Sequence, residues 1–568
     1  MSVRWISIFL AAAGLLCAQP AITDLQPRGA QKGRPFKLTI VGKGFGEETK
    51  VWSTLPATFT PLTPELGGAM SEGKYATFLV EPTAEIPVGV YPIRVLTPEG
   101  ISNIQLFSVG GFPEYAEDES RPGALPNSND TIETAQALPS APLVVNGTLR
   151  GPERDMFRLS AKAGERLVIE VEARRCGSAI DPVLEILDGS GKAIAHSEDA
   201  AMLGLDSRAD VTFPQAGYYY VVVHDARFSN QPANFYRLKI GSYPYPNEIY
   251  PLGGRRGEVV QTSLGAQKIP VDLRNVDAKA KQIMVNLPDS PVLPIPFAVG
   301  DDPEVMAPVN STLQLPVTIN GRLVKAKGVD RYTLAVEPNE PLTLKIQARE
   351  LGTSKLMAVL TAFDAQGSKL GRAGDEPLAE DFYNVNQSRT AGDPVLRIQA
   401  PASGGTITVT VEDLALRGGP EYGYRLNVEK RDRDFRVQLG TPFVNIPAGG
   451  SVSVPVAVTR MGFDNEVTLR IANAPAGLKV EGGFVVGGPP VKESPRARTG
   501  RGVLVLTAAA DARFAPMELH VEGVAKMPDG TEMVRAAEGP GMLVGVTGAT
   551  LQGSVDRQRP ITAPWLGL

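Results

Sequence analysis

Several short motifs occur twice in this sequence, in the same order, and this duplication limits the folds that the chain can adopt. The stretch PRGAQKGRP, from Pro27, is matched by PLGGRRGEV from Pro251. The stretch FSVGGFPE, from Phe107, is matched by FAVGDDPE from Phe297. Because ordered pairs of motifs are typical of a duplicated unit, we predict that each copy begins with a domain that lies between these two motifs.

The segments that follow these motifs are also paired. VVNGTL matches TINGRL, ERDMFRL matches GVDRYTL, and VEARRCGS matches IQARELGT. The last motif pairs share one interval of 188 residues, which places Asp225 opposite Asp413 and Tyr236 opposite Tyr424. We therefore predict a two-domain unit that is used twice, with these residues at equivalent positions.

Strand patterns dominate the sequence. Apolar residues alternate or run continuously in stretches such as RPFKLTIVG, RLVIEVEA and GTITVTVED, and Gly, Pro, Asn or Asp bounds them. The 59 Gly and 48 Pro, with 6% aromatic residues, favour short strands and turns. Asp130–Leu138 is the exception, with the pattern of a short helix capped by Asn129 or Asp130. A chain of 568 residues exceeds one core, so we predict an all-β, multi-domain protein with very little helix.

The first 18 residues have the pattern of a secretory signal peptide. Arg4 precedes the apolar run Trp5–Leu16, and Ala18 offers a small residue for cleavage. Lipid attachment at Cys17 is the alternative, but the residue before it is not small. No later run is long and apolar enough for a transmembrane segment, so we expect a secreted, periplasmic or cell-surface protein. After cleavage Cys176 has no partner for an internal disulfide, and we expect it to be buried and inert.

The sequence offers little for catalysis. Its three histidines, His196, His224 and His520, belong to no recognisable motif, and the sequence has no Gly-x-Ser-x-Gly, His-Glu-x-x-His or Cys-x-x-Cys pattern. Arg255 and Arg256 could hold a phosphate, but a strand pattern follows them, whereas an anion site of this type needs a helix N-terminus. We predict a turn there, and no enzymatic activity. A net charge of -5 without a basic cluster also argues against nucleic acid as a partner.

Two kinds of domain are suggested by longer stretches. PAITDLQPRGAQKG, VGKGF and VGVYPIRVLTPEG fall within residues 19–111, which resemble the IPT/TIG immunoglobulin-like domain of secreted and cell-surface proteins. Residues 244–306 resemble a shortened copy. NDTIETAQAL, ERDMFRL, AGERLVIEVEA and DPVLEILDGSG fall within residues 126–243, which are similar to the bacterial pre-peptidase C-terminal (PPC) domain. Residues 307–431 resemble a second copy of that domain.

The rest of the chain is divided accordingly. Residues 112–125 are predicted as a linker, residues 432–548 as a further immunoglobulin-like sandwich, and residues 549–568 as a Pro-containing tail. The PPC resemblance implies a jelly-roll β-sandwich that serves attachment, targeting or substrate binding in exported bacterial proteins. We therefore predict a non-catalytic binding or scaffold protein whose ligand is a polysaccharide or a protein. The alternative is an accessory part of a secreted peptidase system, or a peptidase with an unrecognised site.

The same resemblance implies a metal ion. Some domains of this kind bind calcium near their N-terminal edge, and the matching positions here are Asn129, Asp130 and Asp155. Calcium binds oxygen atoms of carboxylates, amides and carbonyl groups, and these side chains supply such atoms. The acidic residues expected just upstream are absent, because residues 124–126 read Ala-Leu-Pro. Calcium is thus a possible cofactor of the first copy.

Overall fold

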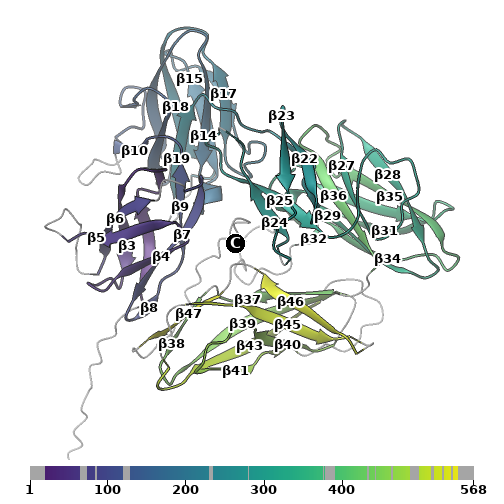
Figure 1. Ribbon diagram of the computed structural model, residues 1–568. Coiled ribbons are helices and arrows are strands. Elements are labelled where there is room, and N and C mark those ends of the chain that lie inside the picture. Colours follow the sequence, from purple (N-terminus) through teal and green to yellow (C-terminus); the bar gives the residue numbers. More distant parts are fainter. Residues whose placement is uncertain are drawn as a thin grey trace, which may run out of the picture.

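The structure is a computed structural model. It describes residues 19–547 apart from several gaps, and the predicted signal peptide and tail lie outside the described residues. The gaps are residues 64–72, 83–85, 119–127, 229–233, 279, 289, 375, 378–390, 431–433, 442, 462–464, 486–497, 513–516, 528–529 and 539–541. In the described part, strands alternate with turns and two short 3-10 helices that lie at equivalent places in the repeat. The prediction of an all-β, multi-domain chain is confirmed (Figure 1).

Residues 19–111 form the first sandwich. One sheet has the order β1-β3-β6-β5 and the other β2-β9-β7-β4, with β8 paired to β7. Leu38, Ile40, Phe78 and Phe107 are buried between the sheets. The strands are β1 (Ala21–Gln26), β2 (Gly29–Gln31), β3 (Phe36–Lys43), β4 (Lys50–Ser53), β5 (Ala57–Pro61), β6 (Tyr75–Pro82), β7 (Gly89–Thr97), β8 (Gly100–Ile101) and β9 (Gln105–Gly110).

Residues 112–243 form the first module, with sheets β10-β12-β19-β14-β17 and β11-β13-β18-β15-β16. Residues 114–116, predicted as linker, instead form a strand parallel to β12, which extends the sheet of the module. The elements are β10 (Glu114–Ala116), β11 (Gln136–Ala137), β12 (Leu143–Thr148), β13 (Arg154–Ala161), β14 (Arg166–Glu172), η3 (Arg174–Cys176), β15 (Pro182–Leu187), β16 (Ala193–Ser197), β17 (Arg208–Thr212), β18 (Gly217–Asp225) and β19 (Phe235–Gly241).

Residues 244–303 form the smaller second sandwich, with sheets β20-β22-β23 and β21-β25-β24. Its core continues into both neighbouring modules, because Val168 and Leu351 belong to the same buried cluster as Phe297. The strands are β20 (Ile249–Tyr250), β21 (Gly253–Arg255), β22 (Val259–Leu264), β23 (Gln267–Asp272), β24 (Gln282–Val285) and β25 (Ile295–Gly300).

Residues 304–430 form the second module, with sheets β26-β27-β36-β29-β34 and β28-β35-β30-β31 and the separate pair β32-β33. The strand orders match those of the first module, except that the place of β11 is taken by a single bridge between Leu313 and Leu334. Asp225 and Asp413 each accept a hydrogen bond from the backbone that leads into β15 or β30. The elements are β26 (Glu304–Met306), β27 (Val317–Arg322), β28 (Val329–Val336), β29 (Pro341–Gln347), η4 (Arg349–Leu351), β30 (Ala358–Phe363), β31 (Lys369–Ala373), β32 (Glu376–Pro377), β33 (Ala391–Gly392), β34 (Val395–Gln399), β35 (Gly405–Asp413) and β36 (Gly423–Glu429).

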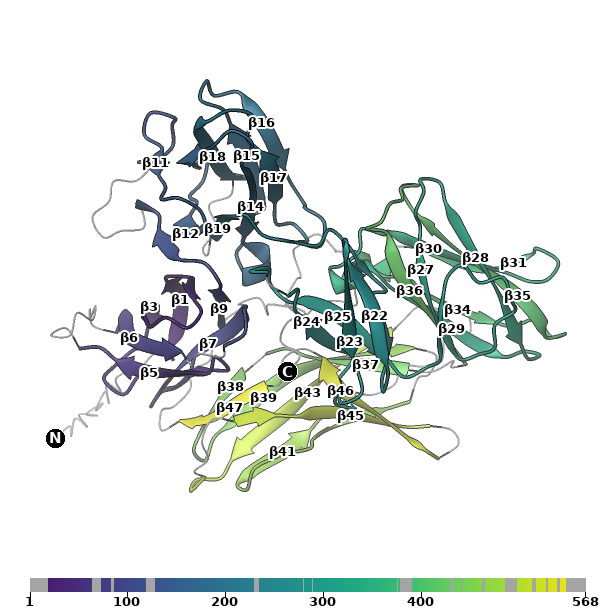
Figure 2. The same ribbon diagram turned by 45° about the horizontal axis from the view of Figure 1, so that its top comes forward.

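Residues 434–547 form the third sandwich, with an eight-stranded sheet β41-β43-β39-β37-β46-β45-β40-β42 and a sheet β38-β47-β44. In Figure 1 it lies beside β8, and in Figure 2 its strand β38 lies near the first sandwich, so the end of the described chain returns to its beginning. Asn445 makes this contact, since its amide donates to Ile101 O (3.0 Å) and accepts from Ile101 N (2.8 Å). The strands are β37 (Asp434–Leu439), β38 (Phe443–Pro447), β39 (Ser451–Met461), β40 (Val467–Ile471), β41 (Leu478–Gly482), β42 (Phe484–Val485), β43 (Arg498–Ala508), β44 (Met517–Leu519), β45 (Val521–Lys526), β46 (Glu532–Glu538) and β47 (Met542–Thr547).

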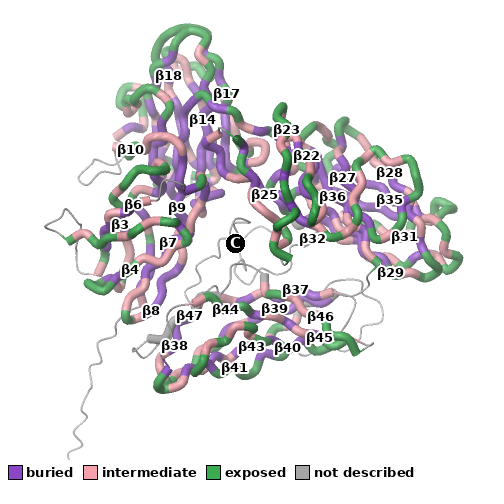
Figure 3. The backbone as a smooth tube through the Cα atoms, viewed as in Figure 1, coloured by how far each residue is buried: buried purple, intermediate pink, exposed green. Residues whose placement is uncertain are grey.

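Burial follows this division (Figure 3). Buried residues lie along the inner strands of each sandwich and module, and exposed residues lie in the turns at their ends. The strand that contains Tyr218, Tyr219 and Tyr220 shows the alternation in detail, because Tyr219 is buried while Tyr218 is exposed. Cys176 is buried as expected, and burial raises the pKa of its thiol to about 12.

A buried arginine joins the first sandwich to the first module. The guanidinium of Arg237 donates to Ser108 Oγ (2.7 Å) and contacts the carboxylates of Glu114 and Glu172. A Cβ atom on Gly29 would overlap this guanidinium. Gly29, in the opening motif, is therefore needed for close approach rather than for an unusual backbone angle.

The second unit repeats the joint. Arg425 donates to Glu304 (2.6 Å), and a Cβ atom on Gly253 would overlap its guanidinium. Within each motif a positive φ is found only at the last glycine, +70° at Gly33 and +85° at Gly257. The motif pairs that revealed the duplication are thus parts of one repeated joint.

Arg256, also in the opening motif, donates to Asp301 Oδ1 (2.8 Å) and to backbone carbonyls. A strand follows, as predicted. These contacts agree with the interpretation of the stretch as a turn.

An aspartate anchors the 3-10 turn of each module. Asp206 accepts hydrogen bonds from the first backbone N–H groups of η3, and Asp393 does the same at η4. The side chain of Arg175 also donates to Asp206 (2.7 Å), whereas the residue at this position of the second module is Glu350. The two turns are therefore alike in backbone, but their second residues carry opposite charges.

Candidate metal centre

Three segments of the first module meet at the start of β13. Asp155 is the second residue of this strand, and Glu153 lies in the turn before it. The segment before β11 brings Asn129 and Asp130 to the same place, where Met156 N donates to Asn129 O (2.9 Å). Glu117 follows β10, and its backbone N–H donates to a carbonyl of β12. Oxygen-bearing side chains are thus gathered at one edge of the module.

The carboxylates form a compact cluster. One oxygen each of Asp130, Glu153 and Asp155 lies within 4.8 Å of the others. Asp155 and Glu117 are both 0% exposed, and Glu153 is 3% exposed. Carboxylates packed this closely repel one another unless a proton or a cation lies among them.

Hydrogen bonds fix the inner carboxylates. Tyr236 donates its hydroxyl to Asp155 Oδ2 (2.5 Å), and Asn129 donates its amide to Glu117 Oε1 (3.1 Å). Thr148 N donates to the other oxygen of Glu117 (3.0 Å). No hydrogen-bond donor among the described residues reaches Asp155 Oδ1, although this atom is buried. An acceptor without a donor in such a place is costly, so it points to a ligand.

Burial, together with the charge of the cluster, raises the pKa of Asp155. Burial raises the pKa of this carboxyl well above its ordinary value, and the neighbouring charges of Glu117 and Glu153 raise it further. The hydroxyl of Tyr236 acts in the opposite direction but does not outweigh them. A cation among the carboxylates would relieve the same repulsion.

The residues fit a hard divalent cation. Every side chain that closes on the centre offers oxygen, the ligand atom of calcium, and calcium–oxygen distances are about 2.3–2.6 Å. Two ligands of one ion are then at most about 5 Å apart. The spacing of Asp130, Glu153 and Asp155 agrees with that limit. Asp130, Glu153 and Asp155 would hold the ion, with Asn129 and Glu117 beside them.

The sequence located part of this cluster. Asp130 and Asp155 come together as the calcium prediction requires, and Asn129 lies beside them. Glu153 and Glu117 were missed. The signal for Glu153 was its place two residues before Asp155. Glu117 stands earlier than the upstream position where an acidic residue was expected.

The helix predicted for Asp130–Leu138 is wrong. Thr131 and Thr134 exchange hydrogen bonds between their side chains and backbones, which favours a turn over continued helix. Residues 136–137 then form β11, parallel to β13, and Leu138 N donates to Arg158 O (2.9 Å). This path turns the backbone so that Asp130 reaches the carboxylate cluster.

The second module keeps the tyrosine–aspartate pair but not the cluster. Tyr424 donates to Asp330 Oδ2 (2.5 Å), as Tyr236 does to Asp155. Ala307 makes the backbone hydrogen bond that Glu117 makes in the first module. Gly328 precedes β28 where Glu153 precedes β13.

The connection before β13 also differs between the copies. Twenty residues separate Glu117 from Leu138, whereas five separate Ala307 from Leu313, which forms the equivalent hydrogen bond. The shorter connection contains no counterpart of the Asn129–Asp130 turn. Within the described ranges, only the first module gathers three such ligands.

The histidines do not form a catalytic set with a serine in the part of the chain that the structure describes. His196 lies 3.2 Å from Glu198, and His224 stacks on Phe228. His520 lies in the third sandwich, where its backbone N–H donates to Asn473 Oδ1 (2.7 Å). The absence of enzymatic activity remains a prediction. No helix of the described residues is long and apolar enough to cross a membrane.

Comparison with known proteins does not show which family this chain belongs to. No model of a known protein family matches this sequence. A stretch of 98 residues is 32% identical to a probable subtilase-type serine protease of Deinococcus radiodurans. This match covers 17% of the present chain and 13% of the protease. The IPT/TIG and PPC resemblances therefore stay predictions.

One of the solved structures that match aligns with most of this chain, but the two structures superpose poorly. The crystal structure of the insect immune protein hemolin matches over 93% of this chain and 100% of its own, at 12% identity. The TM-score is 0.17, which does not indicate a common arrangement of domains.

Proposed function

We propose that this chain is an exported, non-catalytic binding protein whose first module holds a structural calcium ion. Its ligand is a polysaccharide or a protein outside the cytoplasm. The buried Asp155 Oδ1, which accepts no hydrogen bond from the described residues, is the observation that carries the metal part of this proposal. The ion would tie the connection that contains Asp130 to β13 and so fix the edge of the module.

The test is a calcium titration of residues 19–568, followed by scanning calorimetry in calcium and in chelator. At a calcium concentration about 100 times Kd, binding stabilises the folded state by about 2.7 kcal/mol. For a module of this size, that corresponds to a rise in melting temperature of roughly 10 °C. We expect the rise in the wild type and its loss in Asp155→Ala.

The second module supplies the matched control. Asp330→Ala removes the same bond to a tyrosine without touching the carboxylate cluster. This variant should melt lower than the wild type but keep its response to calcium. If Asp155→Ala and the wild type respond equally, calcium is not bound at this centre.

The binding role has its own test. An array of glycans and proteins is probed with residues 19–568, with and without calcium. Reproducible binding to either class supports the proposal. Hydrolysis of a peptide or glycan by the purified chain would contradict the non-catalytic part.

A second candidate is an accessory part of a secreted peptidase system. The stretch of 98 residues that is similar to the Deinococcus radiodurans protease favours it. Under this alternative the chain would bind a peptidase or its substrate rather than a polysaccharide. Co-purification of a peptidase with the tagged chain from the native source would support it.

A further inference from the structure

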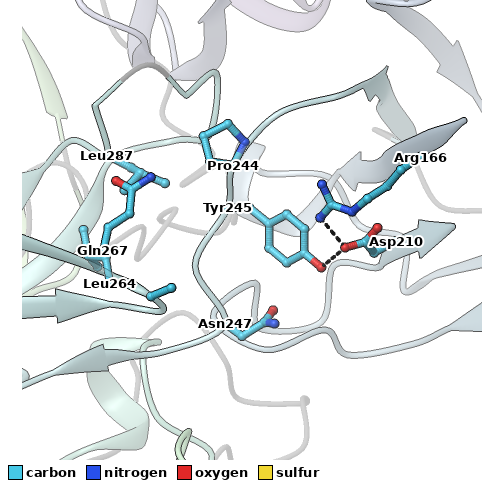
Figure 4. Close-up of a pocket in the computed structure, with 9 residues that line it drawn as sticks. Arg166, Asp210, Pro244, Tyr245, Asn247, Leu264, Gln267 and Leu287 are labelled. Carbon is cyan, nitrogen blue, oxygen red and sulfur yellow. Dashed lines mark hydrogen bonds and ion pairs between the residues drawn. The ribbon is translucent and has the colours of Figure 1, made fainter. Parts of the chain in front are cut away.

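A cavity of about 330 Å³ lies where the first module meets the second sandwich (Figure 4). Arg166 and Asp210 line it from β14 and β17 of the module, and Gln267 lines it from β23 of the sandwich. Tyr245, in the connection between these two domains, lies at the centre of the view. No motif in the sequence pointed to this place.

The aromatic ring of the cavity is held in position. The hydroxyl of Tyr245 donates to Asp210 Oδ2 (2.8 Å). The guanidinium carbon of Arg208 lies 3.9 Å from the ring centroid, and Arg208 also donates to Pro246 O (3.1 Å). With one face covered by Arg208, the ring of Tyr245 can offer only its other face and its edge to a ligand. Such a pre-positioned ring loses little conformational entropy on binding.

The remaining lining is divided into apolar and polar parts. Leu264 and Leu287 are 2% and 5% exposed, so they form an apolar floor. Asn247 and Gln267 are exposed at the rim. Asn247 Oδ1 accepts from Arg208 (3.2 Å), so its amide N–H groups face a ligand as donors, whereas the amide of Gln267 can both donate and accept. A ligand that fits must therefore have an apolar face and several hydroxyl groups.

The cavity carries no net charge to attract an ionic ligand. Arg166 is paired with Asp210 at 2.5 Å. The other polar groups of the rim are neutral amides. An anionic or cationic ligand would have to break the ion pair, whereas a neutral ligand can add hydrogen bonds to it.

We propose that this cavity binds one or two units of a neutral polysaccharide. A pyranose ring has an apolar C–H face, which would lie on Tyr245 and the leucine floor, and hydroxyl groups that would meet Asn247 and Gln267. The volume is at the lower end of the roughly 300–1,000 Å³ range of small-ligand sites, which suits a short stretch of a sugar chain rather than a folded protein surface. The inference rests on the proposed binding function and names its ligand class.

The experiment titrates residues 19–568 with cellohexaose, maltohexaose, xylohexaose and chitohexaose by isothermal calorimetry. We expect at least one of them to bind with Kd below about 1 mM. Tyr245→Ala and Gln267→Ala should each weaken that binding, the first by about tenfold or more. Gln267→Ala alters an exposed side chain, so it remains informative if Tyr245→Ala disturbs the fold.

Tyr218→Ala is the matched control, because Tyr218 is an exposed tyrosine of the same module, 59% exposed, that does not line the cavity. It should bind the saccharide as the wild type does. If all variants bind the saccharide equally, the saccharide does not bind in this cavity, but the proposed binding function is still supported. If none of the four saccharides binds, the proposal is also overturned, and protein binding on the array then decides the proposed function separately.

Discussion

Arg237 and Arg425 occupy equivalent joints, yet their replacement should have unequal effects. Arg237 is fully buried, and its guanidinium contacts Glu114, Glu172 and Ser108. Arg425 is 1% exposed and contacts Glu304. Methionine has a similar length, so Arg237→Met and Arg425→Met keep most of the packing and remove the charge.

The difference in magnitude comes from one carboxylate. Glu172 is 1% exposed, and the corresponding residue of the second module is the neutral Gln347. Burial by itself would raise the pKa of Glu172, but Lys239 and Arg237 outweigh it and lower the pKa. Removing one partner of a buried ion pair costs roughly 3–5 kcal/mol. Because Lys239 still contacts Glu172 after Arg237→Met, we expect the lower end of this range.

At the second joint, removal of the arginine leaves a carboxylate that is better compensated. After Arg425→Met, Glu304 still accepts a hydrogen bond from Asn320 (2.8 Å), and it is partly exposed. Arg425 Nε and Nη1 have no acceptor among the described residues, so their loss removes polar atoms that are poorly paired. We expect a cost of about 1–2 kcal/mol.

Hydrogen exchange measured by mass spectrometry resolves the two joints, which matters because a multi-domain chain does not unfold in one step. The reporters are peptides from β9 for the first joint and from β25 for the second. A loss of about 3 kcal/mol speeds exchange by roughly two powers of ten. An equal effect of both variants, or a larger effect of Arg425→Met, would refute this account of the joints.

Three further predictions use the repeat. Burial raises the pKa of Asp393 to about 7, and the charge of Glu350 contributes. This pKa is above that of Asp393 in the unfolded chain, so the second module should lose stability as pH rises from about 4 to 7. Calorimetry of Glu350→Arg should show a flatter dependence of stability on pH. Gly147→Ala and Gly321→Ala would press a Cβ into the rings of Tyr236 and Tyr424, and each should lower the free energy of unfolding by about 1–3 kcal/mol. In a calcium titration, only Gly147→Ala should weaken binding. Asn445→Ala removes both hydrogen bonds between the third and first sandwiches, so the radius of gyration from X-ray scattering should increase; an unchanged radius would mean that other contacts hold them.

The fold was largely accessible from the sequence because its signals are local. Alternation of apolar residues predicted strands, and the ordered motif pairs predicted that the two modules share a strand order. The helix expected at Asp130–Leu138 failed because the apolar spacing could not reveal the hydrogen bonds between Thr131 and Thr134. Tertiary contacts with β13 decided the conformation of that segment.

The candidate metal centre was only partly accessible. Asp130 and Asp155 were found through a resemblance, whereas Glu117 was not, because its place depends on β10 joining the sheet of the module. The saccharide cavity gave no signal, because its lining comes from two domains and a connection. Neither Tyr245 nor Gln267 belongs to a motif, and only the packing of the domains brings them together.

The guanidiniums of Arg237 and Arg425 pack against Gly29 and Gly253 in the same way. Each sandwich and its module therefore form a cassette that contains both sides of its own joint. A gene segment that encodes one cassette carries both sides of that joint, so copying it yields a unit that assembles without further change. The two copies differ in the connection before β13 or β28, which is longer in the first copy and contains Asn129 and Asp130 there. Protein engineers could use the same property and lengthen the chain by whole cassettes, giving each one a different insertion before the strand that corresponds to β13.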